Sequence, residues 1–196
     1  MRLMMKNKLR IKYNSPVVLT FSLICLIATV LGVISNGRIT EAVFCTYRTS
    51  LLNPMFYIRL FTHVLGHSGM EHFVGNMTYI LLLGPLLEEK YGSKTMIKAI
   101  VITALATGVI NAVLFPQIAL CGASGIVFAF ILLSSFTEFR SGDIPITFIL
   151  IFVIYIGQQI IDGIFVRDNI SNMAHIVGGV VGAILGYGLN RKNKYT

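Results

Sequence analysis

Two residues of this sequence have the types that a nucleophilic hydrolase needs, and each stands at the start of an apolar segment. Ser124 lies in the run Gly122-Ala123-Ser124-Gly125, and His175 opens a later segment. A serine hydroxyl becomes a nucleophile when a neighbouring base takes its proton, and histidine is the commonest such base. Polar and ionisable groups within a bilayer are costly and usually functional. The pair therefore predicts a hydrolase that is embedded in a membrane.

Each of these two residues also has a purely structural interpretation. Ser124 can cap the helix that follows it, and His175 can be a buried, hydrogen-bonded side chain. The chemical interpretation is favoured by a repeat of small residues after the histidine, at Gly178, Gly182 and Gly186. Small residues at this spacing let a neighbouring helix approach closely. If that neighbour is the helix that starts at Ser124, the two side chains come within reach of each other.

Residues near Ser124 and on an earlier segment can complete such a site. Glycines on both sides of Ser124 allow a tight turn and close approach of a substrate, and free N–H groups at a helix start stabilise negative charge. Phe128, one turn further on, can stack on the imidazole or simply pack against core or lipid. His72 and Asn76 share a helix face. They can donate hydrogen bonds into a pocket, or instead join neighbouring helices.

Other reactive side chains offer alternatives. Asp162 and Asp168 fall in the loop before the segment of His175, so a Ser–His dyad is favoured over a triad. Cys121 lies three residues before Ser124 and is an alternative nucleophile. An odd number of widely spaced cysteines argues against a disulfide framework or a zinc site. The three cysteines are Cys25, Cys45 and Cys121.

Three histidines raise the question of a metal ion, because helical histidines four residues apart can bind zinc. They are His63, His67 and His72. The His-Glu-x-x-His pattern of zinc proteases is not formed here. A structural or transported metal ion is therefore an alternative, while serine–histidine chemistry needs no metal and no cofactor.

The composition is that of a membrane protein. Of 196 residues, 55% are hydrophobic and 12% are charged, which is about half the charged fraction of soluble domains. The mean hydropathy is +0.78. The net charge of +8 does not predict nucleic-acid binding, because the basic residues gather at the chain ends and in short connectors. That arrangement is typical of membrane orientation signals.

Six apolar segments predict an all-α, six-span membrane bundle. Their ranges are 16–35, 72–90, 95–115, 124–138, 144–162 and 173–190. Residues 36–71 are too polar to span a bilayer and too apolar for a solvated loop, so we expect a partly helical first loop lying in the membrane interface. The core is thus 16–190, between a basic N-terminal segment, 1–15, and a basic tail, 191–196.

Charge predicts the orientation of the bundle. The positive-inside bias puts both termini in the cytoplasm, and the second, fourth and sixth spans then begin at the outer face. His72, Ser124 and His175 therefore lie at similar depth. The fourth span covers only ~22 Å at 1.5 Å per residue, below the ~30 Å of the hydrocarbon core. We therefore expect Ser124 in a wet pocket sunk from the outer face.

The combined pattern resembles the rhomboid family of intramembrane serine proteases, over about residues 16–190. The motifs that carry the resemblance are Arg59-Leu60-Phe61-Thr62-His63-Val64-Leu65-Gly66-His67 with His72 and Asn76, then Gly122-Ala123-Ser124-Gly125, then Ala174-His175 with Gly178 and Gly182. Two positions depart from the family pattern. Phe128 stands where tyrosine is frequent, and Ile58 stands where tryptophan is frequent. Neither change removes a catalytic group.

The resemblance implies a role for each motif residue. Ser124 would be the nucleophile and His175 the general base. The oxyanion and substrate-binding groups would be Asn76, His72, Gly122, Phe128 and the N–H of Ser124. Structural roles would fall to Arg59, Glu88, Gly178 and Gly182, and residues 163–172 would form a cap over the site. Substrates would be membrane proteins, cut in or near the outer part of a transmembrane segment.

Two other classes of function compete with the protease. A rhomboid-like pseudoenzyme would bind and escort membrane proteins, but such a binder needs neither Ser124 nor His175. A metal-ion transporter would use the histidines. The expected location is a bilayer, with a bacterial plasma membrane favoured by the basic ends. Activity should fall at acidic pH, because a protonated imidazole cannot act as a base.

Overall fold

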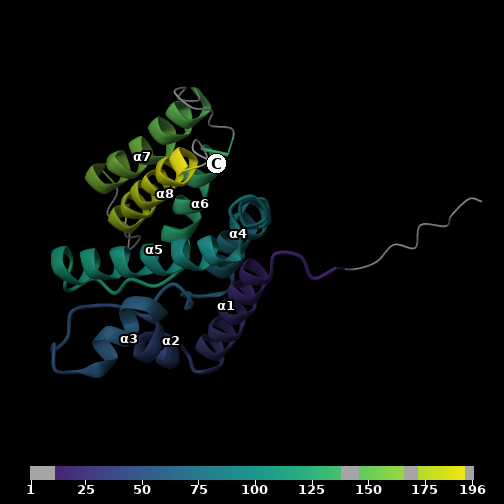
Figure 1. Ribbon diagram of the computed structural model, residues 1–196. Helices are drawn as coiled ribbons and strands as arrows, with labels where there is room; N and C mark the ends of the chain where they lie inside the picture. The colour runs from purple at the N-terminus through teal and green to yellow at the C-terminus, as the bar shows by residue number, and fades with distance from the viewer. Residues whose placement is uncertain (1–11, 138–145, 166–171, 193–196) are drawn as a thin grey trace, which may run out of the picture.

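The computed structural model describes residues 12–137, 146–165 and 172–192, and these residues form eight α-helices (Figure 1). In chain order the helices are α1 (Pro16–Ile34), α2 (Arg38–Phe44), α3 (Pro54–Thr62), α4 (Met70–Tyr91), α5 (Ser93–Leu114), α6 (Ser124–Ser134), α7 (Ile146–Phe165) and α8 (Asn172–Lys192). Among the described residues, β-pairing is confined to one antiparallel bridge, between Thr46 and Leu120.

Three of the described helices are long and apolar enough to cross a membrane. They are Pro16–Ile34, Ser93–Leu114 and Asn172–Asn190. Large apolar side chains are exposed along the long helices, for example Leu23 at 56%, Leu82 at 64% and Ile184 at 65%. Apolar surface of this extent is expected where lipid, rather than water, covers a helix.

The predicted segments coincide closely with the long helices. The helices α4, α5 and α8 begin and end within two residues of the expected 72–90, 95–115 and 173–190. The first loop is partly helical as expected, since it contains α2 and α3.

Two segment ends were wrong. Helix α6 ends at Ser134 instead of 138. The hydroxyls of Ser134 and Ser135 both donate to the carbonyl of Ile131, at 2.7 and 3.1 Å, which weakens the helix at this end. Helix α7 runs to Phe165 instead of 162, so Asp162 belongs to a helix and not to the following loop. Of the expected cap 163–172, residues 166–171 lie outside the described part of the chain, as does Asp168.

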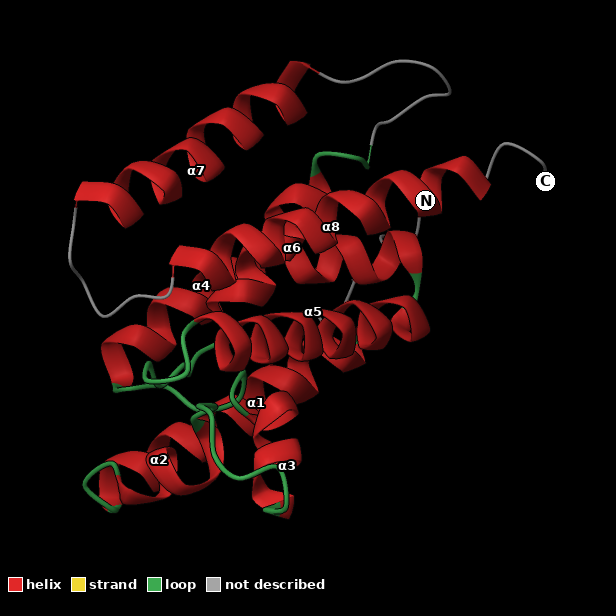
Figure 2. Cartoon of the chain, turned by 90° about the vertical axis from the view of Figure 1, so that its left-hand side faces the viewer, coloured by secondary structure: helices red, strands yellow, loops and turns green. Residues whose placement is uncertain are grey.

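Helix α6 is the centre of the bundle. All its residues from Gly125 to Leu133 are buried, and its most extensive partner is α8, followed by α4 and α5. Figure 2 shows α6 and α8 side by side, with α7 at one edge and α2 and α3 at the opposite end. A helix that is apolar all round belongs in the interior of a bundle, and this one carries Ser124 at its first turn.

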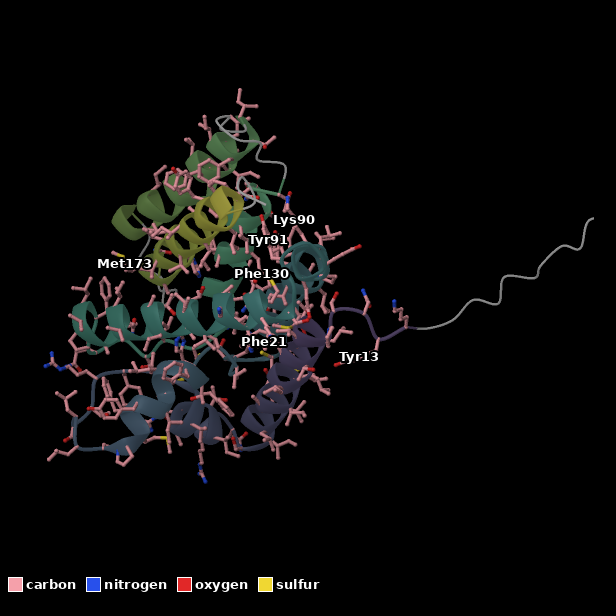
Figure 3. All side chains as sticks on the ribbon, in the orientation of Figure 1. Tyr13, Phe21, Lys90, Tyr91, Phe130 and Met173 are labelled. Atoms are coloured by element: carbon pink, nitrogen blue, oxygen red, sulfur yellow. The ribbon has the colours of Figure 1, made fainter. Side chains whose placement is uncertain are left out.

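The ends of the helices fall on two sides of the bundle. Figure 3 shows Tyr13, Lys90 and Tyr91 on one side and Met173 on the opposite side. The first side thus holds the start of α1 and the end of α4, and the second holds the start of α8. His175 follows Met173 by two residues, at the start of α8.

Candidate active site

The site centres on a hydrogen bond between the first turns of α6 and α8. The Nε2 atom of His175 lies 2.9 Å from the Oγ atom of Ser124. The ring of Phe128 stacks on the imidazole, with centroids 4.5 Å apart and an interplanar angle of 8°. His175 is buried, with 8% of its surface exposed. A hydroxyl and an imidazole held in this way have the geometry of a nucleophile and its general base.

Glycines on α8 make this approach possible. A Cβ atom at Gly178 would lie 2.8 Å from the carbonyl carbon and 2.9 Å from the Cα of Gly125. At Gly182 a Cβ would lie 2.8 Å from both the carbonyl carbon and the Cα of Ala129. Real Cβ atoms do not come so close to backbone, so the two helices touch through their main chains. The expected contact between the glycine face and the helix of Ser124 is confirmed.

Gly122, His72 and Asn76 surround the backbone just before Ser124. Gly122 has φ +120°, a conformation that L side chains rarely adopt. A Cβ there would lie 2.8 Å from Nε2 of His72 and 3.6 Å from Nδ2 of Asn76. The Nδ2 atom of Asn76 is buried without a hydrogen-bond partner among the described residues. An unsatisfied buried donor is rare enough to need an explanation, and an incoming oxyanion would satisfy it.

Two histidines of the first loop accept hydrogen bonds from the backbone just before Ser124. The N–H of Gly122 donates to the carbonyl of His63 at 2.9 Å. The N–H of Ala123 donates to Nε2 of His67 at 3.4 Å, and the Nδ1 atom of that ring lies 3.3 Å from the hydroxyl of Thr29 on α1. His67 thus connects α1 to the nucleophile loop. Its sequence spacing suggested only a metal ligand, so this role was missed.

Burial keeps both of these first-loop histidines neutral. Together with the nearby His72, it lowers the pKa of His67 to about 4. It also lowers the pKa of His63 to about 4, although a hydrogen bond to the carbonyl of Ala104 acts in the opposite direction. A neutral His67 can accept the N–H of Ala123, whereas a protonated ring has no free lone pair to accept it.

The match to known proteins agrees with this geometry. A family model described as the rhomboid domain matches residues 55–192. The chain belongs to the rhomboid family. It is therefore an integral membrane protein, and membership of the family implies intramembrane protease activity.

Two relatives illustrate the similarity of this rhomboid protein. The Haemophilus influenzae protein Rhomboid protease GlpG is 28% identical over 133 residues, which cover 66% of this chain and 68% of that protein. The Mus musculus protein Rhomboid-related protein 2 is 30% identical over 142 residues, which cover 66% of this chain and 47% of that protein. The match therefore spans just under half of the mouse protein.

The three clustered histidines of this rhomboid protein face different partners. Nε2 of His63 lies 3.0 Å from the carbonyl of Ala104, His67 contacts Thr29 and Ala123, and Nδ1 of His72 lies 3.1 Å from the hydroxyl of Ser68. Within the described residues, no group of three or more His, Cys, Asp or Glu side chains is arranged to hold a metal ion.

Arg59 lies in the first loop and holds two of its segments together. Its Nε and Nη2 atoms both donate to the carbonyl of Ala42, at 2.9 and 2.6 Å. The guanidinium group also lies over the ring of Tyr47, 4.8 Å from its centroid. A planar group with several donors suits this combination of a forked hydrogen bond and aromatic contact. These contacts join parts of the first loop, and the structural role of Arg59 stays a prediction.

Glu88 is buried near the end of α4 and caps α1. Its two carboxylate oxygens accept the N–H groups of Val17 and Val18, at 3.1 and 3.0 Å. The hydroxyl of Ser93 donates to the same carboxylate at 2.6 Å. The first N–H groups of a helix have no partner within the helix, so Glu88 supplies from another helix the cap that α1 lacks.

Proposed function

We propose that this rhomboid protein is a serine endopeptidase that cleaves transmembrane segments of membrane proteins. Ser124 is the nucleophile and His175 is the general base. Asn76, His72 and the N–H of Ser124 stabilise the oxyanion. The observation that carries the proposal is the 2.9 Å contact between Nε2 of His175 and Oγ of Ser124, made beside an unsatisfied buried amide, that of Asn76.

The chemistry follows from which atoms can donate and accept protons. With the proton of His175 on Nδ1, its Nε2 accepts the proton of Ser124 as Oγ attacks the scissile carbonyl. The oxyanion that forms accepts hydrogen bonds from Nδ2 of Asn76 and from the free N–H at the start of α6. His175 then donates its new proton to the leaving amine. Water deacylates the serine by the same steps, with His175 again acting as the base.

Gly122 and Phe128 shape the site around these atoms. Because Gly122 has no side chain, His72 and Asn76 can lie close against the nucleophile loop. The stacked ring of Phe128 fixes the plane of the imidazole. A ring without a hydroxyl is sufficient for stacking. Phenylalanine in place of the frequent tyrosine therefore removes no catalytic group.

The proposed topology has six spans with both termini in the cytoplasm. Under it, α1, α4, α5, α6, α7 and α8 cross or enter the bilayer, and α2 and α3 lie at the outer interface. The positions of Lys90 and Met173 at opposite sides of the bundle support it. With only 11 residues, α6 covers ~16 Å at 1.5 Å per residue. Ser124 then lies below the outer surface, where a substrate helix can be met from the membrane.

Labelling with a fluorophosphonate probe tests the nucleophile and base. We expect the detergent-solubilised wild type to be labelled, and Ser124→Ala and His175→Ala to remain unlabelled while folded. Ser134→Ala, at the other end of α6, is the matched control and should be labelled like the wild type. Folded wild-type protein that takes up no probe would refute the activated serine.

A reconstituted substrate tests the endopeptidase activity. We expect wild-type protein in liposomes to cut a single-span membrane protein near the outer end of its span, and Ser124→Ala to leave it intact. Cys121→Ala separates the two nucleophile hypotheses, because it should retain cleavage. If Cys121→Ala is inactive and Ser124→Ala is active, the assignment of the nucleophile is wrong.

A further inference from the structure

Two cysteines that are distant in sequence meet beside the nucleophile loop. Thr46 and Leu120 exchange both backbone hydrogen bonds, N–H to carbonyl at 2.9 Å in each direction, and form an antiparallel bridge. Cys45 precedes Thr46 and Cys121 follows Leu120. In an antiparallel pair, the residues next to a hydrogen-bonded pair face each other without hydrogen bonds between them. The two cysteines occupy that position.

This position has the dimensions that a disulfide needs. Opposed residues that are not hydrogen-bonded have Cα atoms about 4.5 Å apart, and disulfides join Cα atoms separated by about 4.4 to 6.8 Å. Cys45 has extended backbone, with φ −114° and ψ 125°. The two thiols are free and close enough for each to shift the pKa of the other. The backbone therefore does not have to move far for the two sulfur atoms to be bonded.

A cavity gives reagents access to both thiols. Its volume is about 440 Å³, and both cysteines line it together with His67 and Ser68. Other lining residues, Asn36 and Glu41 among them, are exposed at the surface. Cys121 is half-buried, whereas Cys45 is buried. An attacking reagent would therefore reach Cys121 first.

The environment makes Cys121 the more reactive thiol. The hydrogen bond from Cys45 lowers the pKa of Cys121, against the effect of burial. The pKa of Cys45 is raised, first by its hydrogen bond to Cys121 and then by burial. Thiolate, and not thiol, is the attacking species. Much of what raises the pKa of Cys45 is the neighbouring thiolate, and this disappears once Cys121 has reacted.

We propose that Cys45 and Cys121 form a modification site, a dithiol that a disulfide donor oxidises to an intramolecular disulfide. The Cys121 thiolate attacks a sulfur of the donor, which gives a mixed disulfide and releases one donor thiolate. Cys45 loses its proton and attacks the sulfur of Cys121, which releases the second donor thiolate. The two cysteines lose two electrons and two protons, and the donor disulfide gains both as two thiols.

The bond would tie the first loop covalently to the nucleophile loop. Cys121 is followed directly by Gly122, and Ser124 comes two residues later. Hydrogen bonds to His63, His67 and Thr46 are among those that hold this loop in the described structure. The orientation rests on the topology given under Proposed function, in which this face is the outer one. Outside the cytoplasm, disulfides form and persist.

Thiol counting tests the proposal directly. Membranes holding the wild type are incubated with oxidised glutathione or with dithiothreitol, denatured, and alkylated with a maleimide that adds visible mass. We expect three additions after reduction and one, at Cys25, after oxidation, with a 45–121 cross-linked peptide in the oxidised digest. Cys25→Ser should give two additions after reduction and none after oxidation. Three additions in oxidised, folded wild type would overturn the proposal.

A resolving-cysteine variant tests the order of attack. Cys45→Ser should stop at a glutathione adduct on Cys121, whereas Cys121→Ser should take up little glutathione at Cys45. Equal adducts in both variants would overturn the assignment of Cys121 as the attacking thiol.

Thermal unfolding measures the effect of the disulfide on stability. The midpoint should be higher for the oxidised than for the reduced wild type, with no such difference for Cys45→Ser.

Labelling of Ser124 separates this proposal from the protease. These thiol and stability results do not require an activated serine. A disulfide that forms in protein whose Ser124 is never labelled would support the dithiol and count only against the protease. Labelled protein without a disulfide would overturn only the dithiol.

Discussion

Replacing Gly178 with alanine adds one methyl group where α8 crosses α6. The new Cβ would lie 2.8 Å from the carbonyl carbon of Gly125, and ordinary contact begins at 3.4 Å. Because these atoms belong to the backbone of α6, the helices must separate by at least about 0.6 Å, the difference between those two distances, and by more to clear the carbonyl oxygen of Gly125, which lies closer still. The same shift would lengthen the 2.9 Å contact between Ser124 and His175 to at least about 3.5 Å, the limit for a hydrogen bond.

The expected loss of activity follows from that displacement. A misplacement of about 1 Å between catalytic groups costs roughly 100-fold, so we expect Gly178→Ala to slow fluorophosphonate labelling by about 10-fold to 100-fold. Overpacking should also destabilise the fold by about 1 to 3 kcal/mol. Gly188→Ala is the matched control on the same helix, because nothing lies within 4 Å of its Cβ position. Equal labelling rates for both folded variants would refute the reasoning.

Three further predictions concern other contacts. Asn76→Ala should lower kcat by about 10-fold to 1,000-fold, the effect of one oxyanion donor among several, and an unchanged kcat in a substrate assay would remove Asn76 from that role. Glu88→Gln should lower the unfolding free energy by about 1 to 3 kcal/mol, because the buried N–H groups capped at the start of α1 lose an acceptor, while the exposed neighbour Glu89→Gln should have little effect on the midpoint. Stability should fall as pH drops from about 6.5 towards 4, since in this range His63 and His67 are protonated in the unfolded chain but stay neutral in the folded one. Each histidine contributes at most about 3 kcal/mol, and thermal midpoints of His67→Gln should vary less with pH than those of the wild type.

The parts of the fold that the sequence could predict are those with a periodic or compositional signal. The end of α4 and the start of α5 could be located because Gly92 and a cluster of lysines separate two apolar stretches. The pairing of α6 with α8 could be inferred because only a close helix contact explains glycines at every fourth position. That contact in turn brought Ser124 and His175 together.

The remaining contacts have no local signature. Glu88 caps a helix some 70 residues earlier, and His67 holds the N–H of Ala123 across 56 residues. Their partners are backbone groups, which every residue carries, so the identity of the partner leaves no mark on the sequence. The meeting of Cys45 with Cys121 depends likewise on the backbone bridge beside them, whereas the odd number and wide spacing of the cysteines had argued against a disulfide framework.

The cap that Glu88 places on α1 has a consequence for how the protein is made. The N–H groups of Val17 and Val18 leave the ribosome about 70 residues before the carboxylate that accepts them. Until α4 has been synthesised, water or lipid headgroups must hydrate the first turn of α1. The first helix can therefore enter the membrane early, but the cap on its first turn forms only when α4 is beside it. Insertion and packing of α1 are thus two events separated in time.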